Sequence, residues 1–312
     1  MKVAFLFPGQ GSQYIGMGKE FYDNFSEAKE VFQQVDESLG ENLSKLIFEG
    51  DSEELKITSN TQPAIMATSV AILQVLQKIS GKKFEELCDV TAGHSLGEYS
   101  SLCASESINI SDTSKILRKR GVFMQEAVPM GKGAMYALIG CDYDTAQKLC
   151  EELSNDGICE VANDNGGGQI ILSGEKKAFD KIDEFIKPLK IRKAIQLPVS
   201  APFHSSLMKH ATNMMNEELQ KYTFVDPKVR IIANYTADFY KDLNSVKDML
   251  VNQIEGMVRW RETIDKIYRM GVRNFVEIGP GKVLSNLAKR QYSDINTCSL
   301  DSIEGIDKFL NN

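Results

Sequence analysis

The 312-residue sequence predicts an α/β protein in which a small α+β domain is inserted into a larger α/β domain. Short apolar runs, typical of buried strands, alternate with segments whose apolar residues recur at helical spacing. Between residues 128 and 198 the elements follow the order β-α-β-β-α-β, which is typical of a ferredoxin-like unit. We therefore expect residues 1–127 and 199–312 to form the large domain and residues 128–198 the inserted one.

The first elements of the large domain are a strand and helices. Residues 3–7 are all apolar and end at a Pro-Gly turn, which predicts a buried strand. Ser26 is placed to cap the helix that follows it. Thr61 and Pro63 are expected to open a further helix. That helix is apolar nearly all round over residues 64–79, so it should lie buried in the middle of the molecule.

The later elements alternate along the chain. In the large domain we expect strands at residues 88–92 and 275–278 and a helix at residues 95–104. In the inserted domain we expect strands at residues 134–139, 159–162, 169–172 and 192–197, helices at residues 142–153 and 175–186, and a loop at residues 163–168.

Composition narrows the classes of function. The net charge is −7 and the pI is about 5.2, so the chain lacks the excess of basic residues that nucleic-acid binding requires. Six scattered cysteines and three histidines predict free thiols in a reducing cytoplasm and no zinc site. No stretch approaches the roughly 18 apolar residues of a membrane span, and residues 3–7 are too few for a signal-peptide core. We expect a cytoplasmic monomer with no metal, membrane or nucleic-acid partner.

The first candidate for chemistry is Gly-His-Ser-Leu-Gly at residues 93–97, a G-x-S-x-G pattern between an expected strand and an expected helix. In this context Ser95 would sit on a strained turn, where flanking glycines allow close approach of the backbone and the next N–H can stabilise an oxyanion. A glycine-rich turn without chemistry is the alternative, because three fixed positions recur by chance. The strand–turn–helix context favours a nucleophilic serine.

A serine hydroxyl needs a base at neutral pH, and His204 is the best candidate. It follows Ala-Pro-Phe, where proline stiffens the chain just before the imidazole. His94 adjoins the serine with its side chain expected to point elsewhere, and His210 lies on an ordinary amphipathic helix. A structural histidine beside an apolar patch is the alternative for His204.

The glycine-rich loop at residues 8–13, Pro-Gly-Gln-Gly-Ser-Gln, does not fit a nucleotide site. Tyr14 occupies the third glycine position of the dinucleotide fingerprint, and no Lys-Ser/Thr pair follows as in a phosphate-binding loop. Such a loop can instead present a hydrogen-bond donor to an oxyanion, and Gln10 is the natural candidate. The Gly-Pro-Gly-Lys sequence at residues 279–282 is interpreted as a structural strand-to-helix turn.

Five motifs occur together and in order along the whole chain. They are Gly-Gln-Gly-Ser-Gln at residues 9–13, Asn-Thr-Gln-Pro-Ala at 60–64, Gly-His-Ser-Leu-Gly-Glu-Tyr at 93–99, Ala-Pro-Phe-His at 201–204 and Gly-Pro-Gly-Lys at 279–282. In this combination the chain resembles the malonyl-CoA:acyl carrier protein transacylases, the stand-alone acyltransferases of bacterial fatty-acid synthesis. The resemblance implies an α/β-hydrolase-like core with an inserted ferredoxin-like subdomain.

The resemblance also implies the site residues. Ser95 would be the nucleophile and His204 the base, with a main-chain carbonyl in place of a triad aspartate. The backbone N–H groups of Gln10 and Leu96 would form the oxyanion hole. The arginine that binds the malonyl carboxylate matches Arg120, whose fork suits a carboxylate better than lysine would.

Two further residues complete the implied site. The active-site glutamine of the family matches Gln253, in the segment that helps to orient the histidine. Phe203 would crowd a branch at the malonyl C2, although core packing alone could also explain this side chain. No cofactor is expected, because the coenzyme A thioester is itself the substrate.

Several alternatives stay open at this stage. A serine esterase would share the nucleophile and the histidine, but it would have little use for Arg120. A non-enzymatic scaffold that binds a carrier protein has little support while Ser95 and His204 are both present. The same transfer could also serve a polyketide synthase or a malonate decarboxylase, because only the carrier protein would differ.

Docking of an acidic carrier protein to this acidic chain requires local basic clusters. The candidates lie at the end of the inserted domain and after the Gly-Pro-Gly turn: Lys187, Lys190, Arg192, Lys193, Lys289 and Arg290.

Overall fold

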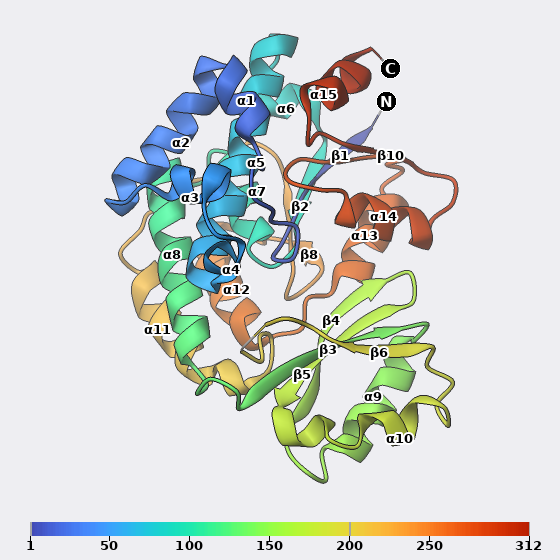
Figure 1. The fold of residues 1–312 in the computed structure, drawn as a ribbon. Coiled ribbons are helices and arrows are strands. Elements are labelled where there is room, and N and C mark those ends of the chain that lie inside the picture. The colour runs from blue at the N-terminus through green and yellow to red at the C-terminus, as the bar shows by residue number, and fades with distance from the viewer. Residues whose placement is uncertain (1, 200, 312) are drawn as a thin grey trace.

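The computed structural model describes residues 2–199 and 201–311 and contains two sheets that belong to two unequal parts (Figure 1). The larger sheet has the order β10-β9-β1-β2-β7-β8, in which every neighbouring pair is parallel except β7 and β8. Its strands are β1 (Val3–Phe7), β2 (Val90–Gly93), β7 (Ile231–Ala233), β8 (Asp238–Phe239), β9 (Asn274–Glu277) and β10 (Asn296–Ser299).

Helices cover both faces of the larger sheet, and the alternation of side chains along β1 shows how. Phe5 and Phe7 pack into a cluster with the helices of residues 19–126, whereas Ala4 and Leu6 pack on the opposite face with α13 and α14. This arrangement of helices on both faces of a mostly parallel sheet is the predicted α/β core. The helices of this part are α1 (Lys19–Asn24), α2 (Ser26–Leu39), α3 (Leu43–Glu49), α4 (Ser52–Lys56), α5 (Thr58–Ser80), α6 (Phe84–Leu87), α7 (Gly97–Ala104), α8 (Ile110–Glu126), η2 (Ser206–Met208), α11 (Lys209–Leu219), α12 (Leu243–Glu255), α13 (Trp260–Arg269), α14 (Val283–Gln291) and α15 (Ile303–Leu310).

The smaller sheet is antiparallel and has the order β4-β5-β3-β6. In sequence order its strands are therefore placed 2-3-1-4, and two helical segments connect them, as the predicted ferredoxin-like unit requires. It has a separate apolar cluster of its own. The exact domain boundaries stay a prediction. The elements are β3 (Gly133–Ile139), α9 (Tyr143–Leu153), β4 (Cys159–Gly166), β5 (Gln169–Glu175), η1 (Lys176–Phe179), α10 (Ile182–Ile186) and β6 (Lys193–Gln196).

Helix α5 differs from its prediction in two ways. It begins at Thr58, because the N–H groups of Asn60 and Thr61 both close onto the Ile57 carbonyl, and Pro63 therefore lies inside it. The helix is also long and apolar enough to cross a membrane by length and composition, contrary to the expectation that no stretch comes near this. Most of it is buried, from Thr61 to Leu73 without interruption, so it serves as the central core helix.

Three other local predictions were wrong. Ser26 does not cap α2, because its hydroxyl donates to its neighbour Glu27 instead. The expected loop at residues 163–168 is largely strand, since β4 continues to Gly166 through two irregularities in its pairing with β5. The helix expected at residues 175–186 is a 3-10 turn followed by the short α10, because the chain is still paired in β5 as far as Glu175.

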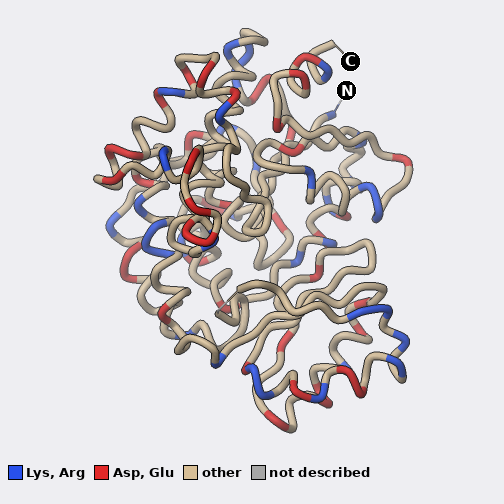
Figure 2. Tube along the Cα trace, in the orientation of Figure 1, with Lys and Arg blue, Asp and Glu red and all other residues tan. Residues whose placement is uncertain are grey.

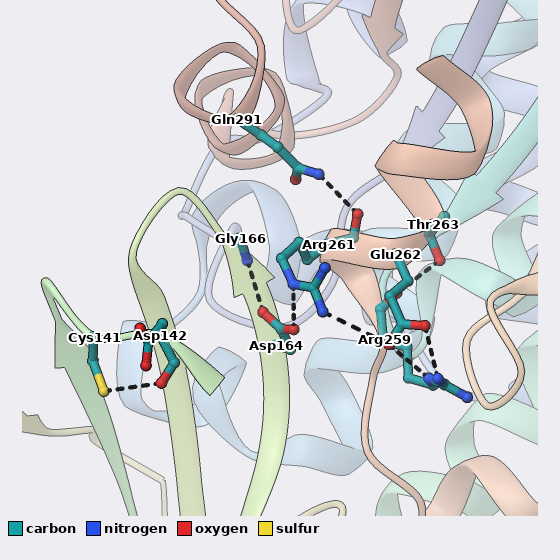
Figure 3. Close-up of polar contacts among 9 residues, drawn as sticks. All are labelled: Cys141, Asp142, Asp164, Gly166, Arg259, Arg261, Glu262, Thr263 and Gln291. Carbon is teal, nitrogen blue, oxygen red and sulfur yellow. Dashed lines mark hydrogen bonds and ion pairs between the residues drawn. The ribbon is translucent and has the colours of Figure 1, made fainter. Parts of the chain in front are cut away.

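Strand β4 ties the inserted part to the core (Figure 3). The Asp164 N–H donates to the Val258 carbonyl at 3.0 Å, and the Val258 N–H donates to the Ala162 carbonyl at 2.8 Å. The buried Asp164 carboxylate also accepts from Arg261 Nε at 2.7 Å, and the Arg261 carbonyl accepts from the Gln291 amide at 2.9 Å. These bonds hold the segment between α12 and α13 against the inserted domain.

Candidate active site

Ser95 lies on a strained turn between β2 and α7. Its φ is 54°, which is rare for a residue with a side chain. The neighbouring glycines are required by space: a Cβ on Gly93 would lie 1.8 Å from the Gly97 carbonyl oxygen, and one on Gly97 would lie 2.2 Å from the Phe7 oxygen. The turn therefore has the geometry expected of a nucleophile elbow.

Asn234, which follows β7, clamps this turn from a distant part of the chain. Its Oδ1 accepts from the Ser95 N–H at 2.7 Å, and its Nδ2 donates to the Gly93 carbonyl at 2.6 Å. Asn234 is fully buried. The strained serine is thus held by a side chain that no motif of the sequence had indicated.

His204 lies beside the serine in the correct orientation for a base. Its Nε2 is 2.9 Å from Ser95 Oγ, and its Nδ1 is 2.8 Å from the Gln253 carbonyl oxygen and 3.2 Å from that of Gly256. Since a carbonyl can only accept, Nδ1 carries the proton and the Nε2 lone pair faces the hydroxyl. Burial, aided by the positive charge of Arg120, lowers the pKa of His204 to about 3, so the ring is neutral at pH 7.

Arg120 enters the same place from helix α8 and is 1% exposed. One terminal nitrogen donates to Gln62 Oε1 at 2.7 Å, and the other donates to Gln253 Oε1 at 2.8 Å and to Ser95 Oγ at 3.1 Å. Its Nε is buried and has no hydrogen-bond partner among the described residues. Burial lowers the pKa of Arg120. The guanidinium also lies 5.5 Å from the centroid of the Tyr99 ring. A buried cation whose hydrogen-bond partners are all neutral is costly, and an anionic ligand would help to compensate it.

A common cavity of about 360 Å³ is lined by Ser95, His204, Arg120 and Gln62. Gln253, predicted to bind the substrate, is fully buried and is not among the residues that line this cavity, and it contacts Arg120 instead. Phe203, which is 7% exposed, lines the same cavity. A larger hollow of about 1130 Å³ between β8, α12 and α13 contains none of the predicted site residues, so we place the site in the smaller cavity.

Two backbone N–H groups near the serine are candidates for the oxyanion hole. Gln10 and Leu96 both line the cavity, and within the described part of the chain no acceptor is found for either backbone N–H. The Gln10 side chain is engaged separately, since its Nε2 donates to Thr58 Oγ1 at 3.3 Å. Leu96 stands at the N-terminus of α7, where the helix dipole also favours negative charge. This arrangement can stabilise an oxyanion formed at Ser95.

His94 and the basic residues predicted to dock a carrier protein lie outside the catalytic group of Ser95, His204 and Arg120. His94 points to Asn165 of β4, with 2.8 Å between Nε2 and Oδ1, and away from Ser95. Figure 2 shows basic residues gathered between α10 and the start of β6, and Lys187, Lys190, Arg192 and Lys193 are all exposed. Lys289 is already engaged, because its ammonium donates to the Ser293 carbonyl at 2.8 Å and to that of Ile295 at 2.6 Å.

Three residues that sequence reasoning missed belong to the same network. Gln62 and Glu98 lie inside quoted motifs, so their positions were marked but their roles were not. Asn234 lies in no motif, and the only signal was an asparagine directly after a short apolar run. Among residues 2–199 and 201–311, no three or more His, Cys, Asp or Glu side chains lie in an arrangement that could hold a metal ion.

Comparisons with known proteins agree over nearly the whole chain. Residues 4–304 match the model of the acyl transferase domain family. The chain is 44% identical over 310 residues to the malonyl CoA-acyl carrier protein transacylase of Bacillus subtilis, covering 98% of this chain and 95% of that one. It is 39% identical over 300 residues to the enzyme of the same name from Salmonella typhimurium, covering 96% of each.

Solved structures are similar in the same way. An acyl-carrier-protein-S-malonyltransferase from Bartonella henselae superposes with a TM-score of 0.96 at 46% identity, covering 100% of this chain and 99% of that one. A malonyl-transacylase in complex with a type II PKS acyl-carrier protein superposes with a TM-score of 0.96 at 35% identity, covering 100% of both chains.

Proposed function

The chain belongs to the acyl transferase domain family, and on that premise we propose that it transfers a malonyl group from malonyl-CoA to the phosphopantetheine thiol of an acyl carrier protein. One observation carries the choice of acyl group. The buried Arg120 guanidinium lies 3.1 Å from Ser95 Oγ and forms no ion pair or hydrogen bond with a carboxylate of the described residues. A malonyl group attached to Ser95 Oγ would bring its own carboxylate close enough to pair with the Arg120 guanidinium.

The first half-reaction acylates the serine. His204 Nε2 takes the hydroxyl proton while Ser95 Oγ attacks the thioester carbon of malonyl-CoA. The Gln10 and Leu96 N–H groups donate hydrogen bonds to the oxyanion that forms. The intermediate then collapses to malonyl-Ser95, and the coenzyme A thiolate leaves and takes the proton from His204.

The second half-reaction returns the serine. The phosphopantetheine thiol gives its proton to His204 Nε2, and its sulfur attacks the malonyl-Ser95 ester carbon. The same oxyanion donors serve again. Collapse breaks the Ser95 ester bond, and the imidazolium returns the proton to Oγ. Since the two thioester partners occupy the cavity in turn, we expect ping-pong kinetics.

Two residues outside the proton transfer tune the site. Arg120 holds the malonyl carboxylate, and its positive charge helps keep His204 neutral and ready to act as base. Phe203 narrows the cavity beside the acyl group and disfavours C2-branched acyl groups. This chemistry uses no cofactor besides the substrate thioester.

The cellular location, oligomeric state and pathway of the enzyme are predictions. We place the enzyme in the cytoplasm as a monomer, in keeping with cysteines that form no disulfide in the described chain. Fatty-acid synthesis is the proposed pathway. Service to a polyketide synthase remains the second candidate, because one similar enzyme was solved with a type II PKS carrier protein.

Intact-mass measurement after incubation with malonyl-CoA tests the proposal. We expect the mass of one malonyl group, mapped to the Ser95 peptide, and its removal by holo acyl carrier protein. Ser95→Ala should form no adduct, and His204→Ala should acylate about 10²–10⁴ times more slowly. No adduct on the wild-type protein, or full transfer by Ser95→Ala, would contradict the proposed function.

A further inference from the structure

Glu98, in the first turn of α7, is completely buried and has no part in the proton transfers. Its Oε2 accepts from Gln253 Nε2 at 2.6 Å and from the Asn234 N–H at 3.0 Å, and its Oε1 accepts from the Tyr240 hydroxyl. All the contacts of this carboxylate are therefore with donors. It makes no direct contact with Arg120, although both groups bind the same glutamine.

The side-chain amide of Gln253 has one orientation that fits these neighbours. Its two hydrogens are used by Glu98 and by the Ser95 carbonyl, the latter at 3.0 Å, and its oxygen faces Arg120 at 2.8 Å. In the flipped orientation the NH₂ group would face the guanidinium, and the amide oxygen would face the carboxylate. Since a carboxylate can only accept and a guanidinium can only donate, both contacts would then be lost.

We propose that Glu98 is a positioning residue for acyl-group selectivity: it locks the Gln253 amide so that its oxygen holds Arg120 beside Ser95. This inference rests on the proposed malonyl transfer. A carboxylate placed directly against Arg120 would compete with the substrate for the guanidinium. Acting through one amide, Glu98 fixes the position of Arg120 and leaves its unused donors free for the malonyl carboxylate.

Three substitutions separate this role from general support of the fold. Glu98→Met keeps the approximate length but removes the acceptor for Gln253 Nε2. Glu98→Gln can keep its amide oxygen toward Gln253 and turn its NH₂ toward Tyr240, whose hydroxyl oxygen can accept as well as donate. Tyr240→Phe removes a different donor from the same carboxylate and is the matched control.

The measurement is the ratio of second-order rate constants for Ser95 acylation by malonyl-CoA and by acetyl-CoA. Glu98→Met should lower this ratio roughly 10- to 100-fold, the effect of losing one or two hydrogen bonds to a charged group. Glu98→Gln and Tyr240→Phe should keep the ratio within about threefold of wild type, because the Gln253 oxygen still faces Arg120. If Glu98→Met does not fold, Glu98→Asp withdraws the carboxylate from Gln253 by one methylene and should lower the ratio in the same direction.

Two results would overturn the inference. If Glu98→Met or Glu98→Asp lowered the rates of Ser95 acylation by malonyl-CoA and by acetyl-CoA by the same factor, Glu98 would only support the turn at Ser95. Loss of selectivity in Glu98→Gln as large as in Glu98→Met would mean that the charge, and not the amide orientation, matters. Failure of the proposed function is separate, since it would appear as the absence of a malonyl adduct on the wild-type protein.

Discussion

Replacing Arg120 by alanine should convert the protein from a malonyl-selective to an acetyl-tolerant transferase. Malonyl differs from acetyl by one carboxylate, so selectivity must come from a group that receives that charge in a partly desolvated cavity. Arg120 is 1% exposed and lies 3.1 Å from Ser95 Oγ, and it is the one arginine or lysine among the described residues that line the cavity. Its hydrogen-bond partners are neutral oxygens, and the Glu98 carboxylate acts on its charge without direct contact.

The magnitude follows from the donors that Arg120 has left. A bidentate pair would add two hydrogen bonds between charged groups, each of about 1.5–3 kcal/mol. We take the lower sum, about 3 kcal/mol, because the cavity opens to solvent and the pair would be partly screened. Since about 1.4 kcal/mol is a factor of ten, malonyl acylation should fall by roughly 150-fold relative to acetyl acylation.

The assay compares initial rates of Ser95 acylation by malonyl-CoA and acetyl-CoA, read by intact mass. Using the ratio cancels any general damage from leaving Gln62 and Gln253 without their donor. Arg120→Lys should recover only part of the malonyl rate, because a point charge cannot reproduce the fork. Arg118→Ala is the matched control: it removes an arginine from the same helix that contacts Asn60 and Glu41 outside the cavity.

An equal loss of acylation rate with malonyl-CoA and with acetyl-CoA would refute the reasoning. If Arg120→Ala lowered malonyl and acetyl acylation by the same factor while the protein stayed folded, Arg120 would be structural. Selectivity would then have to come from Gln253 or from the backbone donors near Gln10.

Two further predictions concern pH and docking. Because burial lowers the pKa of His204 to about 3, the neutral form of the ring persists well below pH 6.5. The rate of acylation of the free enzyme by malonyl-CoA, measured by stopped flow, should therefore stay nearly constant from about pH 7 to 5. A loss of rate centred near pH 6.5 would contradict this prediction. Charge reversal at Lys193 and Arg290 should raise the Michaelis constant for the carrier protein and leave self-malonylation unchanged, whereas equal damage to both half-reactions would refute local attraction. Arg290 is preferable to the neighbouring lysine, whose ammonium is held by two backbone carbonyls.

Much of the framework could be predicted from the sequence because its signals are local. The apolar run of β1 and the order of short elements in the inserted domain follow from side-chain alternation within a few residues. The motif around Ser95 is also local in sequence, but the reasons for its two glycines differ. Gly93 is required by atoms of its own turn, whereas a Cβ on Gly97 would collide with the Phe7 and Pro8 oxygens at the end of β1. The misplaced ends of α5 and β4 depended instead on backbone pairing with Ile57 and with β5.

The chemistry of the site was decided by tertiary structure. His204 is oriented by the main-chain carbonyl of Gln253, and a main-chain atom has no signature in the sequence. Arg120 differs from Arg118 only in the face of α8 it occupies, and packing against Gln62 and Gln253 turns one of them toward Ser95. Asn234 reaches the serine across 139 positions, and such contacts become visible only when separate strands of one sheet end side by side. The sequence alone determined which residue types are present, and the fold determined which of their atoms meet.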